Sequence, residues 1–262
     1  MAPREELSAK LDRGHYRLAM RCSGGGIPTV VFDGNLRGSS LEWQTVRDKV
    51  AAFTRVCTYD REGMARPALT TQRIAEDLRE LLRKAGALPP YVLVGWAFGG
   101  YTVRAYTHQW RDEVAGLVLV DALHEDFFTR YRLVLPPAAS AASDPLQDFR
   151  YQLAGGYRYL ADMEASAAEV RATRTPLENL PLAVVSRSDP DWPNGISAEL
   201  TTRLEQTWQT MQAQLAGLSA NSLHVVAARS GHLVQYDRPD VVVDAIRKVV
   251  EVVRTGGSLT RT

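Results

Sequence analysis

The sequence predicts one α/β domain: a mostly parallel, twisted sheet with helices on both faces and a helical insertion near the middle of the chain. Short apolar runs alternate with amphipathic stretches along most of the 262 residues, which is typical of a parallel sheet covered by helices. A glycine-rich turn at residues 95–100 joins one apolar run to a helix-like stretch. The length suits one large domain with a sizeable core.

Each apolar run is expected to form a strand. In chain order the expected strands are residues 15–21, 29–32, 55–59, 91–94, 116–120, 182–185 and 223–227. Helices are expected between them, because apolar residues such as Ile74, Leu78 and Leu81 recur at helical spacing. The final helix is expected to have Asp237 as its cap and Pro239 in its first turn.

Residues 122–179 break this alternation. They contain no clear strand, and their helix-like sequence is interrupted by Pro136-Pro137 and Gly155-Gly156. An insertion here would lie above the carboxyl ends of the strands, where open α/β sheets bind ligands. We therefore expect a core of residues 1–121 and 180–262 with a helical cap of residues 122–179; the alternative is a surface excursion with a small core of its own. The cap aromatics expected to bind substrate are Phe128, Tyr131 and Tyr157.

Composition excludes several classes of partner. The chain has 31 Lys and Arg against 30 Asp and Glu, a formal net charge of +1, so neither nucleic acid nor an anionic membrane is expected to bind. No long apolar segment and no signal-peptide core are present. Two cysteines, Cys22 and Cys57, are too few for a disulfide framework, so the sequence favours a reducing cytoplasm.

Position 97 is the centre of a motif that normally carries a nucleophile. Residues 95–99 read Gly-Trp-Ala-Phe-Gly. In the strand–turn–helix motif Gly-x-Ser-x-Gly, a sharp turn exposes the serine hydroxyl at the carboxyl end of a sheet. The glycines of that turn are kept here, but Ala97 stands at the serine position. Taken alone, this segment could also be a simple tight turn or a phosphate-binding loop.

Three segments in order identify the resemblance: the chain resembles the α/β-hydrolase fold family over nearly its whole length. The turn at Ala97 is the middle segment. The first, Asp33-Gly34-Asn35-Leu36-Arg37-Gly38-Ser39-Ser40, resembles the family's oxyanion loop, with Asn35 where glycine is usual. The resemblance implies that the N–H groups of Leu36 and Phe98 form the oxyanion hole. The third, Ser230-Gly231-His232, implies that His232 is the general base.

Two aspartates are candidates for the acid that orients His232. Asp189 matches the commoner family position after the seventh strand, although its loop is rich in turn-forming residues. Asp121 ends the apolar run 116–120, at an alternative position used by some members. A carboxylate at the end of a buried strand is costly unless it is paired, and His232 is an available partner. The choice stays open, with a slight preference for Asp121.

The sequence therefore predicts a serine-type hydrolase whose nucleophile position holds alanine. One account is a deliberate Ser→Ala substitution that traps intact substrate. The other is natural loss, which leaves a non-hydrolytic enzyme or a small-ligand-binding protein on the same fold. The family frame around Ala97 favours the first account, or a very recent loss. In either case this chain is expected to form no acyl-enzyme.

The expected partner is a small-molecule substrate, a bulky apolar ester or lactone. The stretch Asp60-Arg61-Glu62-Gly63-Met64-Ala65-Arg66 is similar to one in fungal zearalenone lactonases, and an aromatic cap favours a bulky, uncharged ligand. Asn35, Trp96 and Met64 are further candidate substrate-binding residues. No cofactor or metal is expected, since the Gly24–Gly26 run precedes no helix and no metal-ligand spacing occurs. A homodimer is compatible with the sequence.

Overall fold

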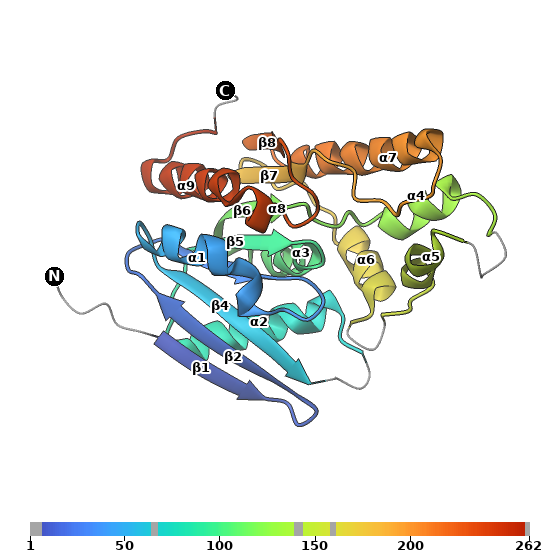
Figure 1. Cartoon of the computed structure of the whole chain (residues 1–262). Coiled ribbons are helices and arrows are strands. Elements are labelled where there is room, and N and C mark those ends of the chain that lie inside the picture. The colour runs from blue at the N-terminus through green and yellow to red at the C-terminus, as the bar shows by residue number, and fades with distance from the viewer. Residues whose placement is uncertain (1–6, 64–67, 139–143, 158–160, 260–262) are drawn as a thin grey trace.

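The computed structural model describes residues 7–63, 68–138, 144–157 and 161–259. Over these residues eight strands form one sheet, in the order β1-β2-β4-β3-β5-β6-β7-β8 (Figure 1). Two antiparallel pairings join β1 (Leu7–Asp12), β2 (Tyr16–Ser23) and β4 (Val56–Gly63). The other pairings are parallel and involve β3 (Thr29–Asp33), β5 (Tyr91–Trp96), β6 (Val114–Val120), β7 (Leu182–Arg187) and β8 (Ser222–Ala227). The predicted fold class is confirmed.

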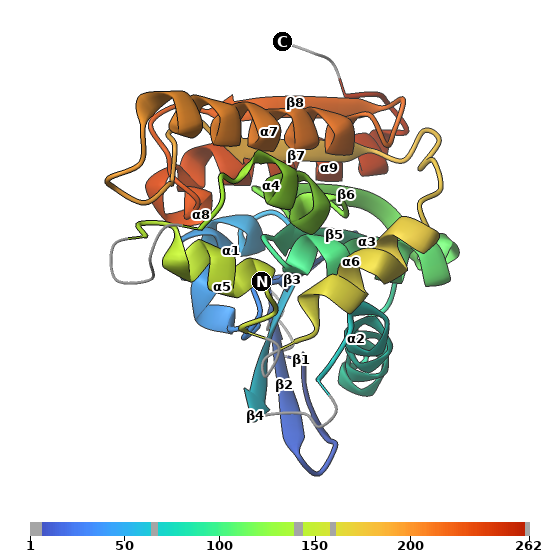
Figure 2. The same cartoon turned by 90° about the vertical axis from the view of Figure 1, so that its right-hand side faces the viewer.

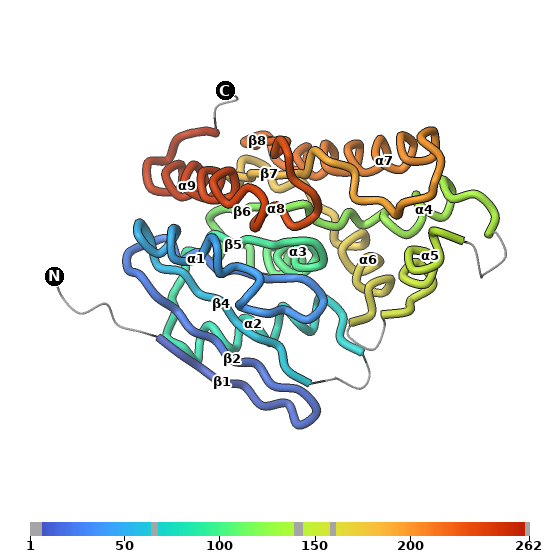
Figure 3. Tube along the Cα trace, in the orientation of Figure 1, coloured from blue at the N-terminus to red at the C-terminus, as the bar shows by residue number. Residues whose placement is uncertain are grey.

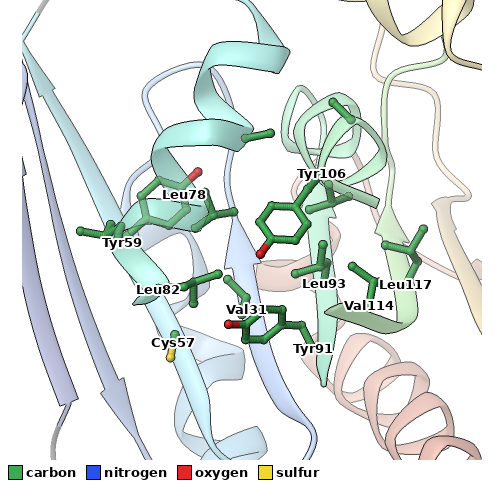
Figure 4. Close-up of a cluster of buried hydrophobic side chains, with 14 of the residues drawn as sticks. Val31, Cys57, Tyr59, Leu78, Leu82, Tyr91, Leu93, Tyr106, Val114 and Leu117 are labelled. Atoms are coloured by element: carbon green, nitrogen blue, oxygen red, sulfur yellow. The ribbon is translucent and has the colours of Figure 1, made fainter. Parts of the chain in front are cut away.

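Helices cover both faces of the sheet because the central strands are apolar on both sides. In β6, Leu117 and Leu119 pack beneath α2 (Thr71–Ala85), α3 (Gly99–Gln109) and α7 (Ala198–Ala216) (Figure 2). The alternate residues Val118 and Val120 pack against α1 (Gln44–Ala51) and α9 (Pro239–Thr255). Figure 4 shows part of the cluster that contains Leu117, where Leu78 and Tyr106 pack against strand residues such as Leu93. Burial on both faces explains why these strands read as continuous apolar runs.

Two details of the predicted elements are wrong. The strand β1 was not expected, because its sequence Leu-Ser-Ala-Lys-Leu-Asp has little β-branched or aromatic character. Asp237 does not cap α9: the cap is Arg238, and Pro239 is the first helical residue. The Asp237 carboxylate instead accepts a hydrogen bond from the Gly231 N–H at 2.9 Å, so it holds the loop before His232.

The two cysteines are paired, which the sequence did not lead us to expect, and the cytoplasmic location stays a prediction. Cys22 on β2 and Cys57 on β4 are directly paired across antiparallel strands, and they form a disulfide. Neighbouring strands bring such a pair within bonding reach, whereas the sequence separation of 35 residues gives no sign of it. Because disulfides persist mainly in oxidising compartments, this finding removes the cysteine argument for a cytoplasmic location. Among the described residues, no helix is long and apolar enough to cross a membrane.

In the described part of the chain between β6 and β7, three helices lie over the carboxyl-terminal edge of the sheet (Figure 3): α4 (Phe127–Val134), α5 (Gln147–Leu153) and α6 (Met163–Ala172). They share an apolar cluster with α3 and α7, in which Phe127 packs edge-to-face on Phe128, Tyr131 and Trp208. This cluster joins the insertion to the core helices. The division into a core and a separate cap domain stays a prediction.

His124, in the segment between β6 and α4, makes the stability of this region depend on pH. Its side chain is 1% exposed, and burial lowers its pKa to about 4. Between pH 6.5 and about 4 the unfolded chain therefore binds a proton at His124 that the folded chain does not. We expect the free energy of unfolding to fall by about 1.4 kcal/mol for each pH unit of acidification in this window.

Urea denaturation from pH 7 to 4.5 measures this slope. His124→Asn is the matched variant, because its amide oxygen replaces the ring nitrogen that accepts the Asp126 N–H at 3.0 Å. The variant should lose the His124 part of the slope while keeping the parts due to every other group. Parallel stability curves for the two proteins would show that His124 is not the source.

Candidate active site

The turn at Ala97 keeps the geometry of a nucleophile elbow without a nucleophile. Ala97 lies between β5 and α3 with φ 51°, a left-handed conformation that is uncommon for a residue with a side chain. A Cβ atom on Gly95 would lie 2.6 Å from the Gly99 carbonyl oxygen, and one on Gly99 would lie 2.5 Å from the carbonyl oxygens of Asp33 and Gly34. Only glycine fits at both positions. The strained turn persists although Ala97 carries no reactive atom.

His232 and Asp121 form a paired base and acid. His232 lies in the loop between β8 and α8 (Val234–Asp237), and Asp121 directly follows β6. The Nδ1 atom of His232 lies 2.6 Å from Oδ2 of Asp121, whose side chain is fully buried. Since a carboxylate only accepts hydrogen bonds, Nδ1–H is the donor. This pairing leaves Nε2 as the nitrogen that can take up a proton from a reacting group.

The His232 imidazole is in contact with the rings of two tryptophans. The Trp96 ring lies 5.2 Å from the His232 ring, and Trp96 Nε1–H donates to the His232 carbonyl oxygen at 3.0 Å. Trp208 of α7 lies edge-on to the imidazole, with ring centroids 6.4 Å apart. Trp96 was predicted to bind substrate. In the structure its indole N–H orients the backbone of the histidine loop.

The buried Asp121 carboxylate is satisfied by three further donors besides His232. Trp208 Nε1–H donates to Oδ1 at 2.8 Å, and the Arg187 backbone N–H donates to the same atom at 3.1 Å. The Arg187 guanidinium lies 3.4 Å from Oδ2 and 2.8 Å from Glu205. These contacts offset the cost of burying a charge at this position. Arg187 and Trp208 were not predicted; only the position of Arg187 at the carboxyl end of a strand could have indicated it.

Asp189, the alternative acid, lies elsewhere in its loop. Its carboxylate accepts a hydrogen bond from the Ser188 hydroxyl at 2.8 Å, and its backbone N–H donates to the Ser230 carbonyl oxygen at 2.9 Å. This is the turn-forming role that a loop rich in Asp and Pro predicts. The structure thus brings Asp121 to the imidazole and leaves Asp189 as a backbone contact of the loop that carries His232.

The loop after β3 contains the predicted oxyanion donor. The Leu36 N–H donates to the side-chain oxygen of the preceding residue, Asn35, at 2.8 Å, and the Asn35 N–H donates to the Glu42 carboxylate at 2.9 Å. Burial raises the pKa of Glu42 above its usual value. The other predicted donor, Phe98, caps the N-terminal end of α3, where backbone N–H groups have no partner inside the helix.

The remaining predicted substrate-binding residues are dispersed. Phe128 and Tyr131 of α4 are buried among other aromatic rings, so they pack the insertion against the core helices. Tyr157 contacts Tyr151 and lines a separate pocket of about 260 Å³ beside α6. Met64 lies outside the described residues. Among the residues that are described, no group of His, Cys, Asp or Glu side chains could hold a metal ion.

Comparisons with known proteins identify the family of the chain. The sequence pattern of the alpha/beta hydrolase family matches residues 22–245. The uncharacterized protein YqjL of Bacillus subtilis is 26% identical over 251 residues, which cover 93% of this chain and 91% of that protein.

Solved structures of other proteins have the same fold as this chain. An esterase from Thermogutta terrifontis is 21% identical, with 97% of this chain and 100% of that chain covered and a TM-score of 0.61. A putative epoxide hydrolase from Pseudomonas aeruginosa is 16% identical, with 97% of each chain covered and a TM-score of 0.62. At these identities the structural likeness establishes the fold and not the activity. With most of its length matched by the family pattern, the chain belongs to the alpha/beta hydrolase family.

Proposed function

We propose that this chain carries the recognition site of an acyl-transfer hydrolase for an apolar ester or lactone, and that it binds this ligand without cleaving it. The observation that carries the proposal is the elbow at Ala97, kept at φ 51° on the same sheet edge as His232 and its buried partner Asp121. A strained turn and a buried charge both cost free energy, and both serve to present and activate a nucleophile at position 97.

With serine at position 97 the parts would act in sequence. His232 Nε2 would accept the hydroxyl proton as Oγ attacks the carbonyl carbon, and Asp121 would stabilise the imidazolium that forms. His232 would then return the proton to the leaving oxygen and activate water to release the acid. Because alanine has no hydroxyl that could attack the carbonyl carbon, the bound ester stays intact.

The substrate class follows from the surroundings of His232. The rings of Trp96 and Trp208 both lie beside the His232 imidazole, with centroids 5.2 and 6.4 Å from it. Such surfaces favour an uncharged, bulky ligand over a small or ionic one. An ester or a lactone fits because the elbow and the His232–Asp121 pair are the parts that acyl transfer uses.

A second function is favoured by the completeness of the His232–Asp121 pair. A histidine oriented by a carboxylate can remove a proton from a bound ligand without any nucleophile. On that account the chain is a natural non-hydrolytic enzyme, or a small-ligand-binding protein, on the same fold. Turnover by the Ala97 protein of a ligand with an acidic C–H group would favour this function over silent binding.

Ligand binding to the unaltered chain tests the proposal directly. We expect a bulky aromatic lactone to quench tryptophan fluorescence in a saturable way and to be recovered uncleaved, whereas small acetate esters bind weakly. Trp96→Phe should remove part of the quench, because Trp96 stacks on His232. A protein that binds no apolar ester or lactone, but binds a charged metabolite, would contradict the proposal.

A further inference from the structure

The geometry of the loop after β3 points to Asn35 as an internal plug of the oxyanion hole. We infer that its side-chain carbonyl accepts the hydrogen bond from the Leu36 N–H that the carbonyl oxygen of a bound ester would otherwise accept. A substrate must therefore displace the Asn35 side chain. The inference rests on the proposed function, because it assigns a role within that same site.

The resemblance of residues 33–40 to the family's oxyanion loop assigns Leu36 as an oxyanion donor, and the position of the loop fits this role. In this fold the hole is formed by the N–H of the residue after the nucleophile and by an N–H from the loop between the third strand and the next helix. Here that loop is residues 34–39, between β3 and the short helix Ser40–Trp43. Asp33 pairs with Gly95 across neighbouring strands, and Gly99 lies against the carbonyls of Asp33 and Gly34. The loop therefore lies against the elbow.

The plug is a close chemical copy of the ligand it excludes. Asn35 Oδ1 is a carbonyl oxygen, and it accepts the Leu36 N–H at 2.8 Å, which is the length of a good hydrogen bond. A substrate carbonyl seeking the same N–H must first break this bond. Since only the Asn35 side chain has to rotate, displacement needs no change of the backbone.

The backbone around the plug is fixed by a buried arginine. Arg61 lies 2.8 Å from Asp33, and its guanidinium also donates to the Asn35 carbonyl oxygen at 2.7 Å. The Arg61 backbone N–H donates to the Gly38 carbonyl oxygen at 2.9 Å, and the Gly38 N–H donates to the Asn35 carbonyl oxygen at 2.7 Å. The loop cannot easily turn another N–H toward the elbow while these contacts hold.

The backbone N–H of Asn35, next to that of Leu36, also has a hydrogen-bond acceptor within the protein. The Asn35 N–H donates to the Glu42 carboxylate at 2.9 Å, and that carboxylate lies so close to Gly34 that a Cβ there would be 1.6 Å from its oxygen. A carboxylate at this point repels a developing oxyanion as well as occupying a donor. The chain thus departs from a working hydrolase at two separate parts of one site, the nucleophile at Ala97 and the oxyanion donor at Leu36.

Kinetics in a serine background test the plug. Ala97→Ser, Ala97→Ser/Asn35→Ala and Ala97→Ser/Asn35→Asp are compared on p-nitrophenyl butyrate, with kcat and KM measured separately. Removing one oxyanion donor costs about 100- to 1,000-fold in kcat. Because the Asn35 side chain can be displaced, its cost is smaller, and we expect Asn35→Ala to raise kcat by about 10- to 100-fold with little change in KM. Asn35→Asp should stay at or below the parent, because it keeps an acceptor and adds a negative charge.

Amide exchange separates failure of the plug from failure of the proposed function. In the Ala97 protein, Asn35→Ala should speed hydrogen exchange at the Leu36 amide, whereas Asn194→Ala, an exposed asparagine of another loop, should not. Equal kcat values with and without Asn35, or an unchanged Leu36 exchange rate, would overturn the plug. If no serine variant turns over any ester while Leu36 exchange responds as expected, the proposed function fails, and the Asn35–Leu36 hydrogen bond is then only a local cap of the Leu36 amide.

Discussion

Ala97→Ser should convert this chain from one without esterase turnover into one that hydrolyses activated esters. The elbow already holds position 97 at φ 51°, so a serine hydroxyl would be presented without rearrangement of the turn. In a well-studied protease the loss of the nucleophile costs about 10⁶-fold in turnover, and a plugged oxyanion donor takes back up to about 100-fold of that gain. We expect an increase of at least about 10³-fold over the Ala97 protein.

Turnover of short and medium p-nitrophenyl esters, together with a panel of lactones, measures this gain. A fluorophosphonate probe followed by intact-mass measurement should label the serine variant once and leave the Ala97 chain unlabelled. Ala97→Ser/His232→Gln is the matched control, which retains the hydroxyl and lacks the general base. A folded serine variant with neither turnover nor labelling would favour the non-hydrolytic function.

The sheet was predictable because its central strands are buried on both faces. Strands such as β5 and β6 are continuous apolar runs, and that pattern fixes both their existence and their place in the sheet. β1 escaped prediction because it is an edge strand with a partly polar face, stabilised by pairing with β2 and not by its own residue preferences. The Cys22–Cys57 bond depends on strand register, which a single sequence does not reveal.

The site was predictable where a residue follows a strand and was missed where it depends on packing. Ala97, Asp121 and His232 all belong to strand ends or loops at one edge of the sheet, so topology brings them together. Trp208 reaches Asp121 from the middle of α7, where periodicity indicates only a core-facing residue. The aromatic residues of the insertion fill space among themselves, which composition cannot distinguish from lining a pocket.

Asn35 changes how the alanine at position 97 is interpreted. A single inactivating substitution would leave the oxyanion donor open, yet the Leu36 N–H is occupied by the Asn35 side chain. Two departures that disable different parts of one reaction favour a chain that has lost hydrolysis naturally over one altered only at position 97. On that account the retained His232–Asp121 pair would serve the ligand binding or proton transfer proposed above.

Asp121→Asn, in the Ala97→Ser background, should lower turnover by about 10⁴-fold, the cost of the same change in a well-studied protease. The amide can present its N–H to His232 Nδ1, which favours the tautomer whose Nε2 cannot accept the serine proton. It also removes the charge that stabilises the imidazolium. KM for p-nitrophenyl butyrate should change little, since Asp121 is fully buried and does not reach the ligand.

Asp189→Asn is the matched control, because it makes the same chemical change in the loop that carries Ser188 and contacts Ser230. Its turnover should stay within a few-fold of the parent, since the backbone N–H that binds Ser230 is kept. Folding must be compared as well, because Asp121→Asn leaves the buried Arg187 with Glu205 as its carboxylate partner. If both variants keep the parent's kcat, Asp121 has no role in orienting His232 during catalysis. If Asp189→Asn alone is inactive, Asp189 is the acid that orients His232, and it comes within reach of His232 only when substrate binds.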